Sequence, residues 1–168
     1  KATAETEPNN SIQQGNVSLP NYYRGTLAGP APSTDVDTFK FEAESGELIF
    51  VGLDGNPHRN NVTLDAKLDL LDADGNTLFS VNNLISQPVN SSTNRTPDSL
   101  TATEPYSPGE AFVYRVMDDG IYHVRVSVHP SVATNVGSGD YLLSIAKGCV
   151  GTIKPNHPVA ITNLVAPA

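Results

Sequence analysis

Short segments that alternate between apolar and polar residues constrain the fold of this chain more than any other feature of its sequence. In TFKFEA, Phe39 and Phe41 alternate with Lys40 and Glu42. Successive side chains of a β-strand point to opposite faces of a sheet, so a period of two predicts strands with one buried face. The segments AFVYRVMDDGIYHVRVSV and DYLLSIA show the same alternation, at Phe112, Tyr114, Val116, Tyr122, Val124, Val126, Val128, Tyr141, Leu143 and Ile145.

Turn sequences separate these segments. Asp74-Gly75-Asn76 lies between two apolar runs and predicts a hairpin, because Gly and Asn tolerate positive φ. Asp119-Gly120 predicts another turn. GELIFVGL is a more continuous apolar run, which favours a strand that is central or buried on both faces. About eight short strands and no helical period predict an all-β protein, an antiparallel β-sandwich or jelly roll.

Length and charge narrow the class of partners. The chain has 168 residues, which suits one domain, and it carries 10 basic against 18 acidic residues, a net charge of −8. A surface of this sign repels phosphate backbones, so we do not expect a nucleic-acid partner. No apolar run is long enough to predict a transmembrane segment. The first residue is Lys rather than Met, and we expect a monomeric module within a larger chain.

Two stretches interrupt the strand pattern. Residues 84–110 are rich in Ser, Thr, Asn and Pro and exceed the length of an ordinary hairpin loop, so the stretch is either mobile or functional. After Gly148 the sequence VGTIKPNHPVAITNLVAPA contains three prolines. We therefore predict one domain over residues 1–148, and a linker or the start of a following module over residues 149–168.

Two segments, ETEPNNS and DVDTF, concentrate oxygen-bearing side chains. In an extended chain alternate side chains turn to the same side, and Ca²⁺ is bound by carboxylate, amide and backbone oxygens. The alternative is a solvated tail in which an Asn caps a short helical turn. Spacing alone leaves both interpretations open for the six candidate ligands Glu5, Glu7, Asn9, Asn10, Asp35 and Asp37.

A third segment, DADGN, imitates part of an EF-hand loop. Such a loop needs Glu at its twelfth position and flanking helices, but counting from Asp72 that position is Asn83, and strands are predicted on both sides. A plain hairpin turn is the preferred interpretation. Asp65 and Asp69, on the strand before it, are predicted to form a solvated face.

No grouping of residues predicts catalysis, so we do not expect an enzyme. The four histidines, at 58, 123, 129 and 157, show no metal-ligand spacing, and His123 is predicted to be exposed on its strand. Cys149 lies where the strands end. Tyr114, Tyr122 and Tyr141 are assigned to the core. Tyr22, Tyr23 and Tyr106 are assigned to loops or strand edges, where packing at the sandwich rim is favoured over anchoring of a ligand.

Six motifs occur in an order that resembles a known family: ETEPNNS, YRGTLAG, STDVDTFKFEAESGELIFVGL, LDAKLDLLDADGNTL, DDGIYHVRVSV and SGDYLLSI. Over about residues 4–147 they resemble the bacterial pre-peptidase C-terminal domain, a β-sandwich module appended to secreted peptidases and other exported enzymes. The segment HPVAITNLVAPA is similar to the opening strand of an immunoglobulin-type module. The region 84–110 departs from the short connection usual in the family.

The resemblance extends to the collagen-binding domains of bacterial collagenases, and it implies a calcium site. An acidic N-terminal segment and an early Asp pair coordinate calcium in those domains. The implied ligands here are Glu5, Glu7, Asn9 and Asn10 with Asp35 and Asp37. The related pattern tends to have Asp where this chain has Asn10, which weakens the site by one charge.

The function implied is that of a non-catalytic accessory module of an exported bacterial multidomain enzyme, secreted or at the cell surface. The module would be stabilised by calcium and would bind an extracellular protein or polysaccharide, or assist export and maturation. The alternative is a structural spacer domain of a large cell-surface protein, without a ligand of its own.

Overall fold

The structure, a computed structural model, describes residues 1–17, 21–28, 35–58, 64–82, 109–128 and 138–148. No helix long and apolar enough to cross a membrane occurs in these ranges. They contain ten β-strands: β1 Thr3–Ala4, β2 Asn16–Val17, β3 Asn21–Leu27, β4 Val36–Ala43, β5 Leu48–Asp54, β6 Ala66–Leu71, β7 Thr77–Val81, β8 Gly109–Arg115, β9 Gly120–Val128 and β10 Gly139–Gly148.

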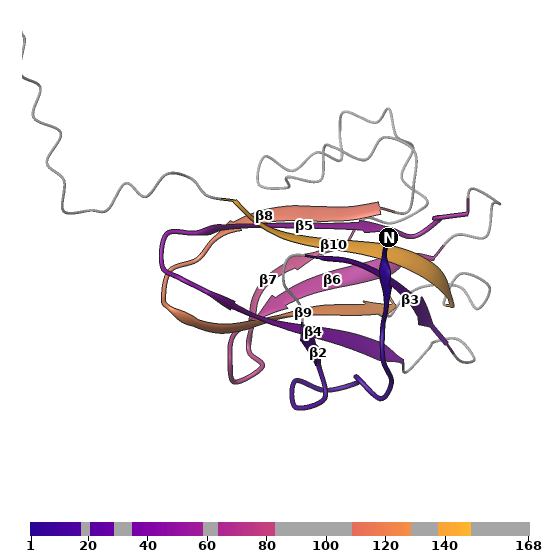
Figure 1. The fold of residues 1–168 in the computed structure, drawn as a ribbon, viewed down its shortest axis with the longest axis horizontal. Helices are drawn as coiled ribbons and strands as arrows, with labels where there is room; N and C mark the ends of the chain where they lie inside the picture. The colour runs from indigo at the N-terminus through magenta and orange to yellow at the C-terminus, as the bar shows by residue number, and fades with distance from the viewer. Residues whose placement is uncertain (18–20, 29–34, 59–63, 83–108, 129–137, 149–168) are drawn as a thin grey trace, which may run out of the picture.

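The strands form two five-stranded sheets, which lie one above the other as a β-sandwich (Figure 1). Sheet A has the order β1-β3-β10-β5-β8, and sheet B has the order β2-β4-β9-β6-β7. The eight strands from β3 to β10 pair antiparallel, which confirms the predicted sandwich.

The prediction of purely antiparallel sheets was wrong at one side of the molecule. There β1 pairs in parallel with β3, and β2 pairs in parallel with β4, so both sheets are mixed. Each of these two strands has only two residues. A strand of that length is too short to show a period of two in the sequence.

The core lies between the sheets and is formed by the predicted alternate positions. Phe39 and Phe41 of β4 are buried, as are Tyr122 and Tyr141. Tyr23, predicted in a loop or at an edge, is also buried, and its ring centroid lies 4.8 Å from that of Phe39. The inward faces of both sheets were therefore largely visible in the sequence.

Strand β5 confirms one of the two alternatives predicted for it, a place inside the sheet, and not the other, burial on both faces. It lies between β10 and β8, so it is not an edge strand. Ile49, Val51 and Leu53 are buried, but Phe50 is 41% exposed on the opposite face. The continuous apolar run thus does not mean burial on both sides, because the outer face of sheet A is open at Phe50.

The segment DADGN forms the predicted hairpin turn between β6 and β7. Asp72 Oδ1 accepts hydrogen bonds from the backbone N–H groups of Asp74 (3.0 Å) and Asn76 (2.8 Å). Asn76 Nδ2 donates to Asp72 Oδ2 (2.9 Å), and Gly75 has φ +88°. Glycine adopts that left-handed conformation without strain.

Two predictions of solvated residues on sheet B were wrong. His123 is buried because the turn lies against its ring, with Asp72 O 3.2 Å from Nδ1. Asp69 is fully buried beneath long basic side chains, with Lys67 Nζ 2.9 Å from Oδ1 and Arg125 Nη2 2.7 Å from Oδ2. Asp65 is also buried. Long cationic side chains cover such carboxylates while their charged ends reach water.

Several predictions concern residues outside the described ranges. The region 84–110 is described only at Gly109 and Glu110, which begin β8. The linker 149–168 with Cys149 lies wholly outside the described ranges, as do Tyr106, His129 and His157.

Candidate metal centre

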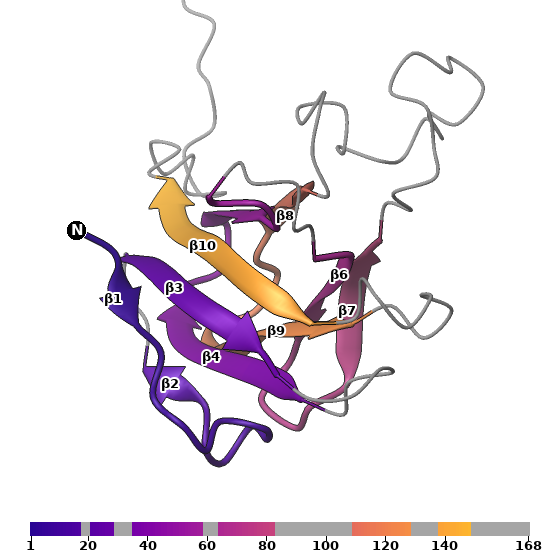
Figure 2. The same cartoon turned by 90° about the vertical axis from the view of Figure 1, so that its right-hand side faces the viewer.

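The N-terminal segment, residues 3–17, runs along one side of the sandwich, and we call it the strap (Figure 2). At sheet A, β1 pairs with β3, and Glu5 N–H donates to Arg24 O (3.1 Å). At sheet B, β2 pairs with β4, and Thr38 N–H donates to Asn9 O (3.1 Å). Main-chain bonds therefore hold the strap to both sheets, with its acidic residues between the two attachments.

Three carboxylates, two from the strap and one from β4, converge at one place. Glu5, Glu7 and Asp37 each offer one oxygen, and these oxygens all lie within 4.8 Å of one another. Two oxygens that bind the same Ca²⁺ at about 2.3–2.6 Å are at most about 5 Å apart. The three carboxylates therefore have the spacing needed to share one ion.

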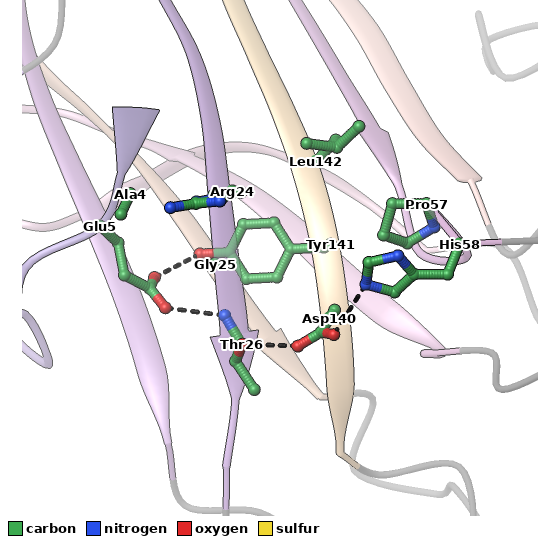
Figure 3. A pocket seen from close by; sticks show the side chains of 10 residues that line it. All are labelled: Ala4, Glu5, Arg24, Gly25, Thr26, Pro57, His58, Asp140, Tyr141 and Leu142. Atoms are coloured by element: carbon green, nitrogen blue, oxygen red, sulfur yellow. Dashed lines mark hydrogen bonds and ion pairs between the residues drawn. The ribbon is translucent and has the colours of Figure 1, made fainter. Parts of the chain in front are cut away.

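Tyr141 brings a hydroxyl group to the same carboxylates from β10. Its Oη lies 2.5 Å from Asp37 Oδ2 and 2.8 Å from Glu5 Oε2 (Figure 3 shows the bond to Glu5). A tyrosine hydroxyl has one proton and donates one hydrogen bond at a time. Two carboxylate oxygens share that donor, so this part of the site lacks positive charge.

Gly25 allows the ring of Tyr141 to reach this position. The two residues are paired across β3 and β10, and a Cβ at position 25 would overlap Tyr141 Cζ and Oη. The other carboxylate oxygen of Glu5, Oε1, accepts from Thr26 N–H (2.7 Å). Glu5 is therefore fixed from both sides.

Burial and repulsion raise the pKa values of Asp37 and Glu7. Removal from water, with repulsion by Glu5 and Asp35, raises the pKa of Asp37 to about 8, although the Tyr141 hydroxyl opposes the shift. Removal from water also raises the pKa of Glu7. The pKa of Tyr141 is raised far above its usual value by burial and the adjacent carboxylates, so it remains a donor. The shifts of Asp37 and Glu7 both disfavour the charged form of a carboxylate at this site.

The amide of Asn9 completes the buried part of the site. Asn9 is fully buried, and one of its two polar amide atoms faces Asp37 Oδ1 (3.0 Å), Val36 O (3.2 Å) and Glu7 Oε2 (3.3 Å). With nitrogen in that place, its two N–H groups face the three oxygens, and the amide oxygen accepts from Asn16 Nδ2 (3.0 Å). With oxygen there, four oxygens meet, an arrangement that a cation stabilises.

The remaining two predicted ligands lie beside this group. Asp35 is not among the three converging carboxylates, and its Oδ2 accepts from Ala28 N–H (2.6 Å). Asn10 is exposed, and its amide lies 3.1 Å from Asp35 Oδ1 and 2.8 Å from Val36 O. Their roles as ligands stay predictions. Of the six candidates, Glu5, Glu7 and Asp37 converge, and the amide of Asn9 lies beside Glu7 and Asp37.

Sequence reasoning missed Tyr141 and Gly25 as parts of the site. Tyr141 was assigned to the core from its alternation, and it is indeed fully buried. No local signal marks a core tyrosine whose hydroxyl bonds to Asp37, 104 positions away. Gly25 lies within the motif YRGTLAG, but only the paired strand shows which side chain needs the space.

A second polar cluster lies on the outer face of sheet A. Asp140 Oδ1 accepts from Thr26 Oγ1 (2.6 Å), and Asp140 Oδ2 lies 3.0 Å from His58 Nε2 (Figure 3). Activation of a hydroxyl nucleophile places the histidine between hydroxyl and carboxylate. Here the carboxylate is in the middle and the histidine does not contact the hydroxyl, so the cluster lacks the order needed for such activation.

No family model and no curated protein matches this chain. Among solved structures, it is similar to the pre-peptidase C-terminal domain of collagenase from Bacillus anthracis, with a TM-score of 0.50 and 14% identity over 84% of this chain and 99% of that chain. This likeness shows a shared fold.

Periplasmic inhibitors of g-type lysozyme have lower TM-scores. The Aeromonas hydrophila protein has a TM-score of 0.46 and 11% identity, over 80% of this chain and 96% of its own. The Salmonella Typhimurium protein has a TM-score of 0.45 and 18% identity, over 80% of this chain and 99% of its own. These two carry no argument about function.

Proposed function

We propose that this chain is a non-catalytic accessory module of an exported multidomain protein, and that one Ca²⁺ clamps its strap to the sandwich. The observation that carries the proposal is the convergence of Glu5, Glu7 and Asp37 around a single shared hydroxyl donor. The candidate ligand atoms of these three residues are all carboxylate oxygens, the kind of ligand that Ca²⁺ prefers. Membership of the pre-peptidase C-terminal domain family, with roles in binding a substrate or surface or in export and maturation, is part of this proposal, supported by the shared fold.

The clamp has a clear physical task. Fixing the backbone of a terminal segment costs about 1–2 kcal/mol per residue in conformational entropy. The main-chain bonds at β1 and β2 offset part of this cost, but Glu5 and Asp35 repel the buried carboxylate of Asp37. A divalent cation would replace that repulsion with attraction. Sites of extracellular modules bind Ca²⁺ at about 10⁻⁴–10⁻³ M, so we place the module outside the cell.

Thermal unfolding with and without calcium tests the clamp. An ion at one hundred times its Kd adds about 2.7 kcal/mol to the free energy of unfolding. For a domain of this size that corresponds to a rise in Tm of about 5–10 °C over a chelated sample. Asp37→Ala should abolish the difference.

Asp72→Ala is the matched control, since it removes a carboxylate from the hairpin turn, and it should leave the calcium response intact. Equal melting curves for the wild type in calcium and in chelator would refute the clamp. Isothermal titration calorimetry of calcium into protein that was stripped with a chelator, with the chelator then removed, should give one bound ion in the wild type and none in Asp37→Ala.

A further inference from the structure

The outer face of sheet A presents apolar side chains to solvent where a polar face is expected. Tyr22 is 68% exposed, Phe50 41% and Leu142 36%. They belong to β3, β5 and β10, which are neighbours in the sheet. Exposed apolar side chains gathered on one face of a sheet are a feature of binding sites.

The floor between the two aromatic rings is open. Ser144 pairs with Tyr22 on one side and with Gly52 on the other, so these three residues form one row across the sheet. A Cβ at Gly52 would meet no atom within 4 Å. Phe50 lies two residues further along β5, which by strand spacing places its Cα about 12 Å from that of Tyr22. A ligand therefore has room to lie flat between the rings.

The ring of Phe50 is held in place before any ligand binds. It lies against the backbone of Gly148 on β10, where a Cβ would overlap its Cε2 atom. An aromatic group that is already positioned loses little conformational entropy on binding, so its contact contributes more to affinity.

A pocket of about 470 Å³ continues this surface beyond Leu142. Leu142 pairs with Arg24, which stands at one side of the pocket, while His58 and Asp140 stand at the other (Figure 3). The bonds from Asp140 to Thr26 and His58 fix the orientation of this polar end. The pocket thus offers donors, acceptors and an apolar wall together.

We propose that this face, called the platform and formed by Tyr22, Arg24, Phe50, His58, Asp140 and Leu142, binds a neutral polysaccharide. Sugar hydroxyls both donate and accept hydrogen bonds, which suits a pocket with an arginine at one side and a carboxylate–histidine pair at the other. The C–H faces of pyranose rings pack on exposed aromatic rings. The sequence analysis favoured rim packing for Tyr22, but its exposure leaves the ring open for such a contact.

The same chemistry disfavours two other occupants. An extended polypeptide gains affinity by pairing its backbone with a sheet edge, whereas the backbone groups of β10 and β5 are engaged by neighbouring strands on both sides. A polyanion would be repelled by the net charge of −8. The platform specifies the ligand class of the accessory module and so rests on that part of the proposed function. Glu5 of the clamp also lines the pocket beyond Leu142, whereas Glu7 and Asp37 do not.

Affinity electrophoresis tests the platform, with calcium present throughout. The protein is run through native gels that contain hydroxyethyl cellulose, xylan, laminarin or glycol chitin, and we expect retardation in at least one of them. Tyr22→Ala and Phe50→Ala should each weaken the Kd about tenfold, the loss typical of one well-packed aromatic contact. The double variant should migrate as it does without polysaccharide.

Leu78→Ala is the control, since Leu78 is 40% exposed on β7 of the other sheet. It should be retarded like the wild type, and melting curves should show that every variant is folded. Migration unchanged in all four gels overturns the proposal, as does a double variant that binds like the wild type. A fifth gel contains gelatin, a polypeptide. Retardation in that gel and in none of the polysaccharide gels would assign the face to a polypeptide and also overturn the proposal. Retardation that survives in Asp37→Ala, with no calcium response in the wild type, would refute only the clamp.

Discussion

Two acidic segments of this molecule, ETEPNNS in the strap and DADGN in the β6–β7 turn, look alike in sequence and differ in structure. In the turn, Asp72 accepts hydrogen bonds from Asp74 and Asn76, and the bonds from Asn76 lower its pKa. At the strap, Asp37 is buried beside Glu5 and Glu7, and burial raises its pKa to about 8.

The difference shows what makes an acidic segment a candidate cation site. The turn supplies its carboxylate with N–H donors from the next four residues, so its charge is already stabilised within one loop. The strap brings Glu5 and Glu7 next to Asp37 of β4. The hydroxyl of Tyr141 on β10 is the single donor that Glu5 and Asp37 share. Each segment carries two carboxylates, and the balance of hydrogen-bond donors and acceptors around them distinguishes the two.

The largest expected effect is an inverted dependence of stability on pH in the absence of cations. The pKa of Asp37 is raised to about 8 in the folded protein, against about 3.9 in an unfolded chain. The folded state then binds the extra proton between these values. The contribution of Asp37 to stability should therefore be fully present below about pH 4 and fall by up to about 1.4 kcal/mol per pH unit as pH rises toward 8.

Urea unfolding of the chelated protein at several pH values measures this slope. Asp37→Asn has no titrating group at this position and should give a nearly flat profile over the same window. Saturating calcium should also remove the decline in the wild type, because the ion binds the deprotonated carboxylates. A wild-type profile that rises from pH 4 to pH 8 in chelator would show that Asp37 is ionised, like Asp72, and the contrast between the segments would fail.

Gly25→Ala should break the strap site and leave the turn unaffected. The added Cβ overlaps the ring of Tyr141, which is buried and has no space to move away. We expect a loss of about 3 kcal/mol in the free energy of unfolding, at the upper end for overpacking, and a weaker response to calcium. Gly52→Ala in the same sheet is the control, since its Cβ would meet nothing within 4 Å. Similar losses in both variants would mean that close approach to Tyr141 is not what position 25 requires.

Tyr141→Phe should have a smaller effect on stability. It tests whether the Tyr141 hydroxyl is the hydrogen-bond donor on which Asp37 and Glu5 depend. The phenylalanine keeps the packing but removes the hydroxyl that Asp37 and Glu5 share. In chelator we expect a loss of about 1–3 kcal/mol, the cost of leaving a buried acceptor without its donor. Tyr122→Phe, which loses a bond to Asp118 O (2.7 Å) away from the strap, is the control. Only Tyr141→Phe should alter calcium affinity in a titration, and equal affinities would remove Tyr141 from the site.

The sequence predicted the eight long strands because each buries one face, which leaves a period of two in its residues. It did not predict β1 and β2, since main-chain pairing over two residues leaves no pattern in the side chains. The burial of His123 was missed for a related reason. In the alternation of β9, His123 falls on the outward face, which predicts exposure. The β6–β7 turn with Asp72 covers it, and that turn is distant in sequence.

The candidate site was predictable only where its residues lie close in sequence or carry charge. The spacing in ETEPNNS and DVDTF singled out Glu5, Glu7, Asn9 and Asp37, which the fold brings together. The hydroxyl of Tyr141 was not predictable, because a buried tyrosine in an alternating strand reads as core. Its role depends on the pairing of β10 with β3, a contact between distant segments.

The smallest expected effect concerns the turn itself, and it tests the comparison from the other side. Asp72→Ala removes the acceptor of three hydrogen bonds within an exposed loop, so we expect a modest fall in Tm. Because those donors belong to the same loop and are left facing water, the fall should be equal in calcium and in chelator. Paired melting curves measure it. A fall that appears only in calcium would mean that the turn binds the ion despite its full set of donors, and donor balance would no longer distinguish the two segments.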